Sequence, residues 1–86
     1  MNHFTRPIFW DFYRQLPPEI QILADKNYAL LKENPRHPSL QLKPIGRLWS
    51  VRITEDYRAL GLDDKIGIVW FWIGKHKEYE RLLKRG

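Results

Sequence analysis

The first third of the chain places apolar residues at helical spacing. Aromatic and aliphatic side chains recur every three or four positions, which predicts a first helix with one apolar side. These residues are Phe9, Phe12, Tyr13 and Leu16. Thr5 is placed to cap this helix, Pro7 suits its first turn, and Pro17-Pro18 ends it.

A second helix is predicted from Pro18 to Asn34. Pro18 suits a first helical turn, and Glu19 adds a negative charge where the helix dipole is positive. Asn34 precedes Pro35, and a residue before proline avoids the helical conformation. One face of this helix carries Ile20, Leu23, Ala24, Asn27 and Leu31. The two helices therefore form a hairpin with one apolar side.

The apolar spacing changes to alternation after a polar loop, 35–39, and a basic stretch that contains Lys43 and Arg47. Alternation predicts three antiparallel strands, joined by short acidic turns. The predicted strands are Leu48–Ile53, Tyr57–Leu62 and Ile66–Ile73. A short helix is predicted after Gly74. The fold class is therefore α+β, with an N-terminal helical hairpin packed on a three-stranded antiparallel sheet and a short C-terminal helix.

The turns also predict how these strands pair. A hairpin centred on Glu55 sets Arg52 directly opposite Arg58. Pairing of the next two strands around Asp64 sets Arg58 opposite Trp70. The same register pairs Ala59 with Val69 and Tyr57 with Phe71. Like charges directly opposed on a sheet are mildly destabilising, so an anion is expected between the two arginines.

This register separates the residues of the sheet into two faces. The apolar face, expected beneath the helical hairpin, carries Val51, Ile53, Tyr57, Ala59, Val69, Phe71 and Ile73. The opposite face carries Ser50, Arg52, Arg58, Trp70 and Trp72. The second face is therefore expected to be cationic and aromatic.

Length and charge narrow the class of protein. Eighty-six residues without a linker predict one domain, residues 1–86. A net charge of +5 favours nucleic acid, an acidic protein or an anionic membrane surface as partner. The longest apolar run, 66–74, is about half the roughly 20 residues of a spanning helix, which excludes a membrane span. The N-terminus lacks an apolar signal segment, so a cytoplasmic protein is expected.

The chain offers no obvious metal site. It contains no cysteine, which excludes disulfides, thiolate zinc sites and cysteine nucleophiles. His3, His37 and His76 do not follow the spacing of metal ligands. We therefore expect no metal and no other cofactor.

Two pairs of residues are candidates for chemistry on RNA. Arg52 and Arg58 suit a phosphate, because guanidinium groups bind phosphate oxygens with two parallel donors. His76 suits proton transfer, since imidazole titrates near neutral pH, and Tyr79 follows it at helical spacing as a second proton donor. The 2′-hydroxyl of RNA is an internal nucleophile that needs only deprotonation.

Each candidate also has a structural interpretation. The two arginines would form ordinary salt bridges with Glu55, Asp56, Glu78 or Glu80. A lone histidine near a helix start is more often structural than catalytic. Trp70 and Trp72 suit stacking on unpaired bases, but coverage by the terminal helix is the favoured interpretation.

Three segments resemble the RelE/ParE superfamily of toxins from type II toxin–antitoxin systems. They are Trp49-Ser50-Val51-Arg52, Tyr57-Arg58-Ala59-Leu60 and the stretch from Trp70 to Glu80. The segments 16–20 and 34–40, on either side of the long helix, are similar to those of compact ParE-like toxins. The resemblance covers nearly the whole chain.

The resemblance implies a toxin that is neutralised by an antitoxin protein. RelE-type members cleave mRNA on the ribosome, which implies catalytic roles for Arg52, Arg58, His76 and Tyr79. The expected RNA-binding residues are Lys43, Arg47, Ser50, Trp70 and Lys75. Ser50 stands where RelE-type nucleases carry a lysine, and Tyr79 lies earlier than their tail would place a tyrosine. Two alternatives stay open: a ParE-type toxin that inhibits DNA gyrase without being an enzyme, and a degenerate toxin that only binds its antitoxin.

Overall fold

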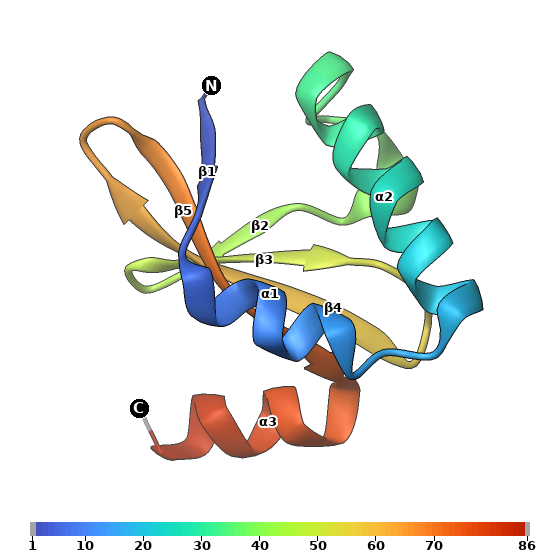
Figure 1. Cartoon of the computed structure of the whole chain (residues 1–86). Helices are drawn as coiled ribbons and strands as arrows, with labels where there is room; N and C mark the ends of the chain where they lie inside the picture. The colour runs from blue at the N-terminus through green and yellow to red at the C-terminus, as the bar shows by residue number, and fades with distance from the viewer. Residues whose placement is uncertain (1, 86) are drawn as a thin grey trace.

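The computed structural model describes residues 2–85 as three α-helices, a 3-10 turn and a five-stranded mixed sheet (Figure 1). In chain order the elements are β1 (His3–Thr5), α1 (Pro7–Arg14), α2 (Pro18–Glu33), η1 (Pro38–Leu40), β2 (Lys43–Ile45), β3 (Leu48–Arg52), β4 (Tyr57–Asp64), β5 (Gly67–Lys75) and α3 (His76–Arg85). The strand order is β1-β5-β4-β3-β2, with β1 parallel to β5 and the other neighbours antiparallel. The predicted α+β class and the three helices are confirmed, but the sheet is larger than predicted.

Two short edge strands account for the larger sheet. β1 is three residues long and pairs His3 with Ile68, far away in the sequence. β2 is equally short and contains Pro44, which is tolerated because β2 lies at an edge of the sheet. Neither segment is long enough to show an alternating pattern, so both were missed.

Proline sets the bounds of the first two helices. α1 begins at Pro7, but Arg6 is its N-cap residue and makes no side-chain capping bond. The predicted Thr5 cap is therefore wrong: Thr5 ends β1, and its Oγ1 accepts a hydrogen bond from Trp10 Nε1 at 3.1 Å. α2 begins at Pro18 and stops just before Asn34, as predicted. Its Leu23 is exposed rather than part of the buried stripe.

The first predicted pairing is confirmed and the second is wrong. Arg52 lies opposite Arg58 on β3 and β4. Arg58 lies opposite Gly74, however, four positions beyond the predicted Trp70. The β4–β5 turn is centred between Lys65 and Ile66 rather than on Asp64, which moves each partner by three positions. A bulge in β5 adds the fourth position. Ala59 and Tyr57 consequently lie opposite Ile73 and Lys75.

The shifted β4–β5 turn reverses the predicted faces in the first half of β5, and the bulge restores them in the second half. Leu60 pairs with Trp72 and Gly61 pairs with Trp70, so Phe71 is the extra residue between them. Before the bulge the faces are therefore the reverse of those predicted, and Trp70 joins the core cluster of Ile73. Val69 and Phe71, predicted beneath the helices, are instead half-buried on the opposite face. Trp70, predicted on the cationic face, lies beneath the helices, whereas Trp72 is on the predicted face.

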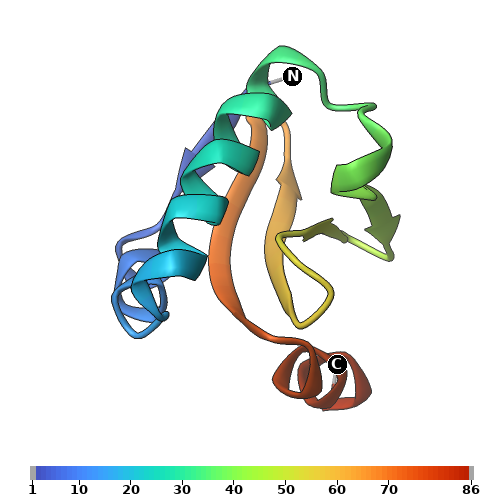
Figure 2. The same ribbon diagram turned by 90° about the vertical axis from the view of Figure 1, so that its right-hand side faces the viewer.

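Two apolar clusters form around the sheet. The larger one lies between α1, α2 and the face that we call the helix-covered face, and includes Val51, Ala59, Ile68, Trp70 and Ile73. The smaller one joins α3 to the opposite face through Leu60, Trp72 and Tyr79. Figure 2 shows α2 on one side of the sheet and α3 beyond the end where β5 leads into it. Part of the second face is therefore uncovered.

Trp70 fastens the N-terminal strand to this core. Its side chain is only 2% exposed, and its Nε1 donates a hydrogen bond to His3 Nδ1 at 3.1 Å. The two rings stack with centroids 6.1 Å apart. Burial lowers the pKa of His3 below its usual value, and the charge of Lys32 adds to this effect. The neutral imidazole of His3 therefore accepts the hydrogen bond from Trp70. The Trp70 ring, buried in this way, is not available to stack on a base.

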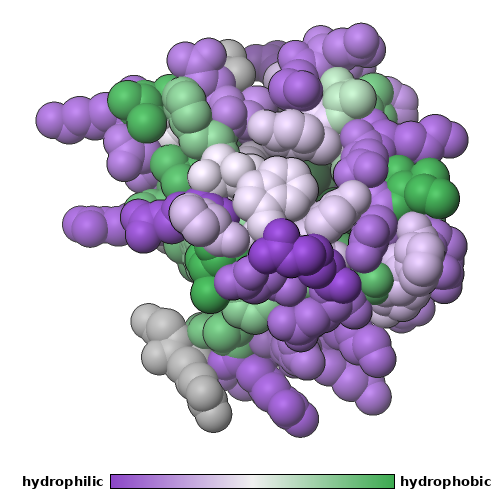
Figure 3. Space-filling view, viewed as in Figure 1, coloured by the Kyte–Doolittle hydropathy of each residue, from purple (hydrophilic) through white to green (hydrophobic). Residues whose placement is uncertain are grey.

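The exposed apolar residues are scattered over the surface. Ile8, Trp10 and Ile22 are among the exposed large side chains of the helices. On the side seen in Figure 3, hydrophobic residues appear as separate green areas among hydrophilic ones. This side therefore presents no broad apolar surface. In the part of the chain that is described, no helix is long and apolar enough to cross a membrane.

Candidate functional site

Arg52 and Arg58 lie opposite each other on the uncovered part of the sheet, which we call the cationic face. Both residues are half-buried. Within residues 2–85, the ion pairs that form are Arg14–Asp11 at 2.5 Å and His76–Glu80 at 3.5 Å, and neither includes Arg52 or Arg58. The expected alternative, salt bridges from these arginines to nearby carboxylates, does not form.

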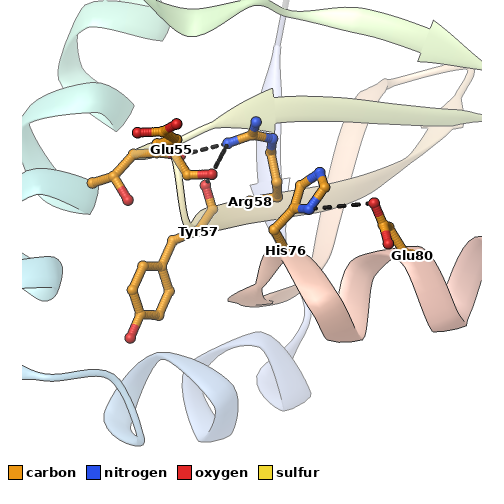
Figure 4. Close-up of polar contacts among 6 residues, drawn as sticks. Glu55, Tyr57, Arg58, His76 and Glu80 are labelled. Atoms are coloured by element: carbon orange, nitrogen blue, oxygen red, sulfur yellow. Dashed lines mark hydrogen bonds and ion pairs between the residues drawn. The ribbon is translucent and has the colours of Figure 1, made fainter.

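The β3–β4 loop, residues 53–56, holds the guanidinium of Arg58 by its backbone. Arg58 Nη1 donates to the carbonyl oxygens of Thr54 and Tyr57, the latter at 3.1 Å, with a long contact of 3.5 Å to Glu55 O. Figure 4 shows the guanidinium directed at this loop, while the ring of Tyr57 points away toward α1. Carbonyl groups orient the guanidinium without neutralising its charge.

The electrostatic setting of Arg58 is unfavourable to a cation. Burial lowers the pKa of Arg58, and the neighbouring charge of Arg52 lowers it further. Tyr79, Asp56 and Glu55 act in the opposite direction. An arginine stays protonated in proteins, so Arg58 cannot lose its proton to escape the repulsion from Arg52. A bound anion between the two arginines would relieve it.

His76 begins α3, two residues after Gly74, the strand partner of Arg58, and Figure 4 shows it at the same end of the sheet as Arg58. Its backbone N–H donates to Asp56 O at 2.7 Å, which ties α3 to the β3–β4 loop. The side chain is 40% exposed, and its Nδ1 lies 3.5 Å from Glu80 Oε1. Nε2 makes no hydrogen bond to another residue within 2–85, so it is available to a substrate. His76 is thus oriented by Glu80 and open to solvent.

Tyr79 packs its ring against the imidazole of His76. Its ring stacks on the imidazole with centroids 5.5 Å apart and an angle of 23° between the planes. The residue is 6% exposed and packs with Leu60 and Trp72. Tyr79 thus lies against His76, which follows Gly74, the residue paired with Arg58, by two positions. The four residues predicted to be catalytic therefore lie together.

The predicted RNA-binding residues are more widely dispersed. Lys43 lies opposite Ser50 and is exposed on the cationic face, but Ser50 is only 2% exposed and offers little surface. Arg47 lies in the β2–β3 turn, at the other end of β3 from Arg52 and about 13 Å or more along the strand. Lys75 pairs with Tyr57 and belongs to the helix-covered face.

Two features of this face were not predicted. Gly74 lies opposite Arg58, and the Trp72 ring crosses it so closely that a Cβ would lie 2.6 Å from that ring. Farther along the sheet, register aligns one apolar residue from every strand on the face. This apolar row is Ile45, Leu48, Leu62, Val69 and Phe4, none of which is buried. Only the correct register reveals the row, since two of its strands were missed.

No group of three or more His, Asp and Glu side chains in residues 2–85 is arranged to hold a metal ion. The candidate site brings together two guanidinium groups, an imidazole and a phenol.

Comparison with known proteins places this chain in a family and finds structures with a similar fold. A family model described as the ParE-like toxin domain matches residues 18–81. Comparison with curated protein sequences gave no match.

Three solved structures with a similar fold are distant from this chain in sequence. The RelB–RelE antitoxin–toxin complex from Methanococcus jannaschii matches with a TM-score of 0.70 at 13% identity, over 92% of this chain and 96% of that one. The YoeB/ParE toxin from Agrobacterium tumefaciens matches with a TM-score of 0.66 at 16% identity, over 88% of this chain and 99% of that one. The isolated E. coli RelE toxin matches with a TM-score of 0.60 at 16% identity, over 96% of this chain and 95% of that one. These likenesses establish the RelE-like fold.

Proposed function

Because this chain belongs to the ParE-like toxin domain family, we propose that it is the toxin of a type II toxin–antitoxin system and cleaves mRNA at the ribosome without a metal ion. The observation that supports cleavage most directly is the pair Arg52 and Arg58, which face each other without a carboxylate partner and lie beside His76. The ligand proposed for the two arginines is an RNA phosphate.

The proposed reaction is attack by the 2′-hydroxyl of one nucleotide on its own 3′-phosphate. The new bond joins the 2′-oxygen to phosphorus, and the bond from phosphorus to the 5′-oxygen of the next nucleotide breaks. The products are a 2′,3′-cyclic phosphate and a 5′-hydroxyl. Arg52 and Arg58 hold the phosphate and stabilise its developing charge. His76 takes the proton of the 2′-hydroxyl, and Tyr79 gives a proton to the departing 5′-oxygen, which leaves as the 5′-hydroxyl. Transfer of the proton from His76 back to Tyr79 restores both side chains.

The proposal is tested by brief induction of the protein, followed by primer extension on cellular mRNA and a gyrase supercoiling assay on the same cells. Discrete in-frame cuts with normal supercoiling support cleavage. Inhibited gyrase with intact mRNA would instead support the ParE-type alternative. No effect on growth would indicate a degenerate toxin.

We expect His76→Ala to lower the rate of mRNA cleavage about 10²- to 10⁴-fold, because this is the usual contribution of a general acid or base. Association with the ribosome should persist, since both arginines remain. His37→Ala is the matched control: His37 lies in the loop before η1, where its Nδ1 accepts from Ser39 N at 3.2 Å. Cleavage by purified His76→Ala at the wild-type rate would remove His76 from the mechanism.

We also propose that an antitoxin covers the cationic face. Lys43, Arg52 and Arg58 supply positive charge, and the apolar row beside them supplies contact area, so a segment with acidic and apolar residues is the expected partner. Among the solved structures with this fold, the Methanococcus jannaschii RelB–RelE and E. coli RelBE structures are toxin–antitoxin complexes. A small protein encoded beside this one should co-purify with it and suppress toxicity. If no such neighbour binds, the partner proposal is wrong.

A further inference from the structure

The β3–β4 loop positions two members of the candidate site. Its backbone carbonyls accept hydrogen bonds from Arg58 Nη1, and Asp56 O accepts the N–H of His76 at 2.7 Å. Two backbone hydrogen bonds to Tyr57 O, at 3.0 and 3.3 Å, close the loop. Any shift of this loop therefore moves both the guanidinium of Arg58 and the first residue of α3.

Asn27 reaches this loop from the opposite side of the sheet. It is a half-buried polar residue on the side of α2 that also carries the buried Ala24 and Leu31. Its Nδ2 donates to Ile53 O at 2.9 Å and to Arg52 O at 3.3 Å. In the described part of the chain, these are the only side-chain hydrogen bonds that join α2 to the sheet. Asn27 thus binds the chain where β3 ends and the loop begins.

Other contacts of α2 do not fix the loop in the same way. An apolar hollow of about 50 Å³ separates α2 from the sheet, with Leu31 on one side and Val51 and Ala59 on the other. Apolar contacts are non-directional, whereas an amide that binds two successive carbonyl oxygens restricts their orientation. The orientation of the loop therefore depends on Asn27 more than on its apolar neighbours.

We propose that Asn27 is a positioning residue of the RNA-cleaving site and acts across the sheet. Its side chain holds the carbonyls of Arg52 and Ile53, and the loop then keeps its own carbonyls on Arg58. Asn27 touches no substrate, because it lies on the helix-covered face. The inference rests on the proposed cleavage of RNA, but the orientation of Arg58 can be measured independently of cleavage.

Gln21 provides a matched control on the same helix. Its Nε2 also donates to two backbone carbonyls, Tyr13 O at 3.2 Å and Leu16 O at 3.1 Å, but these belong to the α1–α2 connection. Asn27→Asp and Gln21→Glu therefore each replace an amide that binds two carbonyls with a carboxylate that repels them. The readouts are kcat and KM for cleavage on programmed ribosomes, the melting temperature, and the NMR chemical shift of Arg58 Nε–Hε.

Both variants should lower the melting temperature by similar amounts. Only Asn27→Asp should shift the Arg58 signal and lower kcat, by about 10²-fold, because small displacements of a reacting group cost that much. KM should change little, since the binding surface remains. Asn27→Gln keeps an amide donor and should recover part of the lost rate.

The proposal is wrong if Asn27→Asp loses activity only in proportion to its unfolded fraction and leaves the Arg58 signal unmoved. Should Asn27→Asp fail to fold, Asn27→Leu, which fills similar space without a charge, is judged by the same two criteria. If the wild-type protein cleaves no mRNA, the proposed function fails, and the Arg58 signal alone then decides whether Asn27 positions the arginine.

Discussion

Arg58→Ala should abolish toxicity and lower the rate of mRNA cleavage by about 10²- to 10³-fold, as the loss of one preorganised donor to a developing charge does elsewhere. Arg58 is central to the site because it lies opposite Arg52, beside His76, and is oriented by the β3–β4 loop. Folding should change little, since the lost hydrogen bonds are offset by relief of the repulsion from Arg52, which lowers the pKa of Arg58.

Arg14→Ala is the control for loss of a positive charge, because Arg14 is exposed and pairs with Asp11 in α1. It should cleave at the wild-type rate. The measurement is single-turnover cleavage by purified proteins, with the melting temperature and antitoxin binding recorded for each. An Arg58→Ala protein that cuts mRNA as fast as Arg14→Ala would eliminate the arginine pair as the phosphate site.

Trp70→Ala should destabilise the fold by about 3–5 kcal/mol, whereas Phe71→Ala should cost clearly less. Trp70 is 2% exposed and bonds His3, while Phe71 is half-buried on the other face. Such a loss approaches the whole stability of a small domain, which starts near 5 kcal/mol. Denaturant unfolding of the two purified variants measures the difference.

Trp70→Phe serves if Trp70→Ala is too unstable to purify. It keeps an aromatic ring but loses the hydrogen bond to His3 Nδ1, so it should be less stable than wild type by an intermediate amount. A larger loss from Phe71→Ala than from the Trp70 variants would contradict the observed register of β5, which pairs Trp70 with Gly61 and places it in the core.

Local features of the fold could be predicted from the sequence. The bounds of α2 depend on Pro18 and on Asn34-Pro35, which act on their own neighbours. The opposition of Arg52 and Arg58 depends only on the short loop between β3 and β4. Both predictions succeeded because the determining residues are adjacent in the chain.

Features that depend on distant contacts could not be predicted. The parallel pairing of β1 joins His3 to Ile68, and three residues carry no periodic pattern. The bulge at Phe71 reverses the alternation of β5, and no residue there marks it. Asn27 looked like one more position on the face of α2, because its two carbonyl partners lie 25 and 26 residues away.

The most direct test of the proposed chemistry is cleavage of two mRNAs on programmed ribosomes, one all-ribose and one with a single 2′-deoxynucleotide at the mapped cut. We predict that purified wild-type protein cuts the first mRNA at one position, leaving a 2′,3′-cyclic phosphate and a 5′-hydroxyl, and leaves the second intact at that position. Equal cutting of both mRNAs would exclude attack by the 2′-hydroxyl, and no cutting of either would contradict the assignment of Arg52, Arg58 and His76 as an RNA-cleaving site.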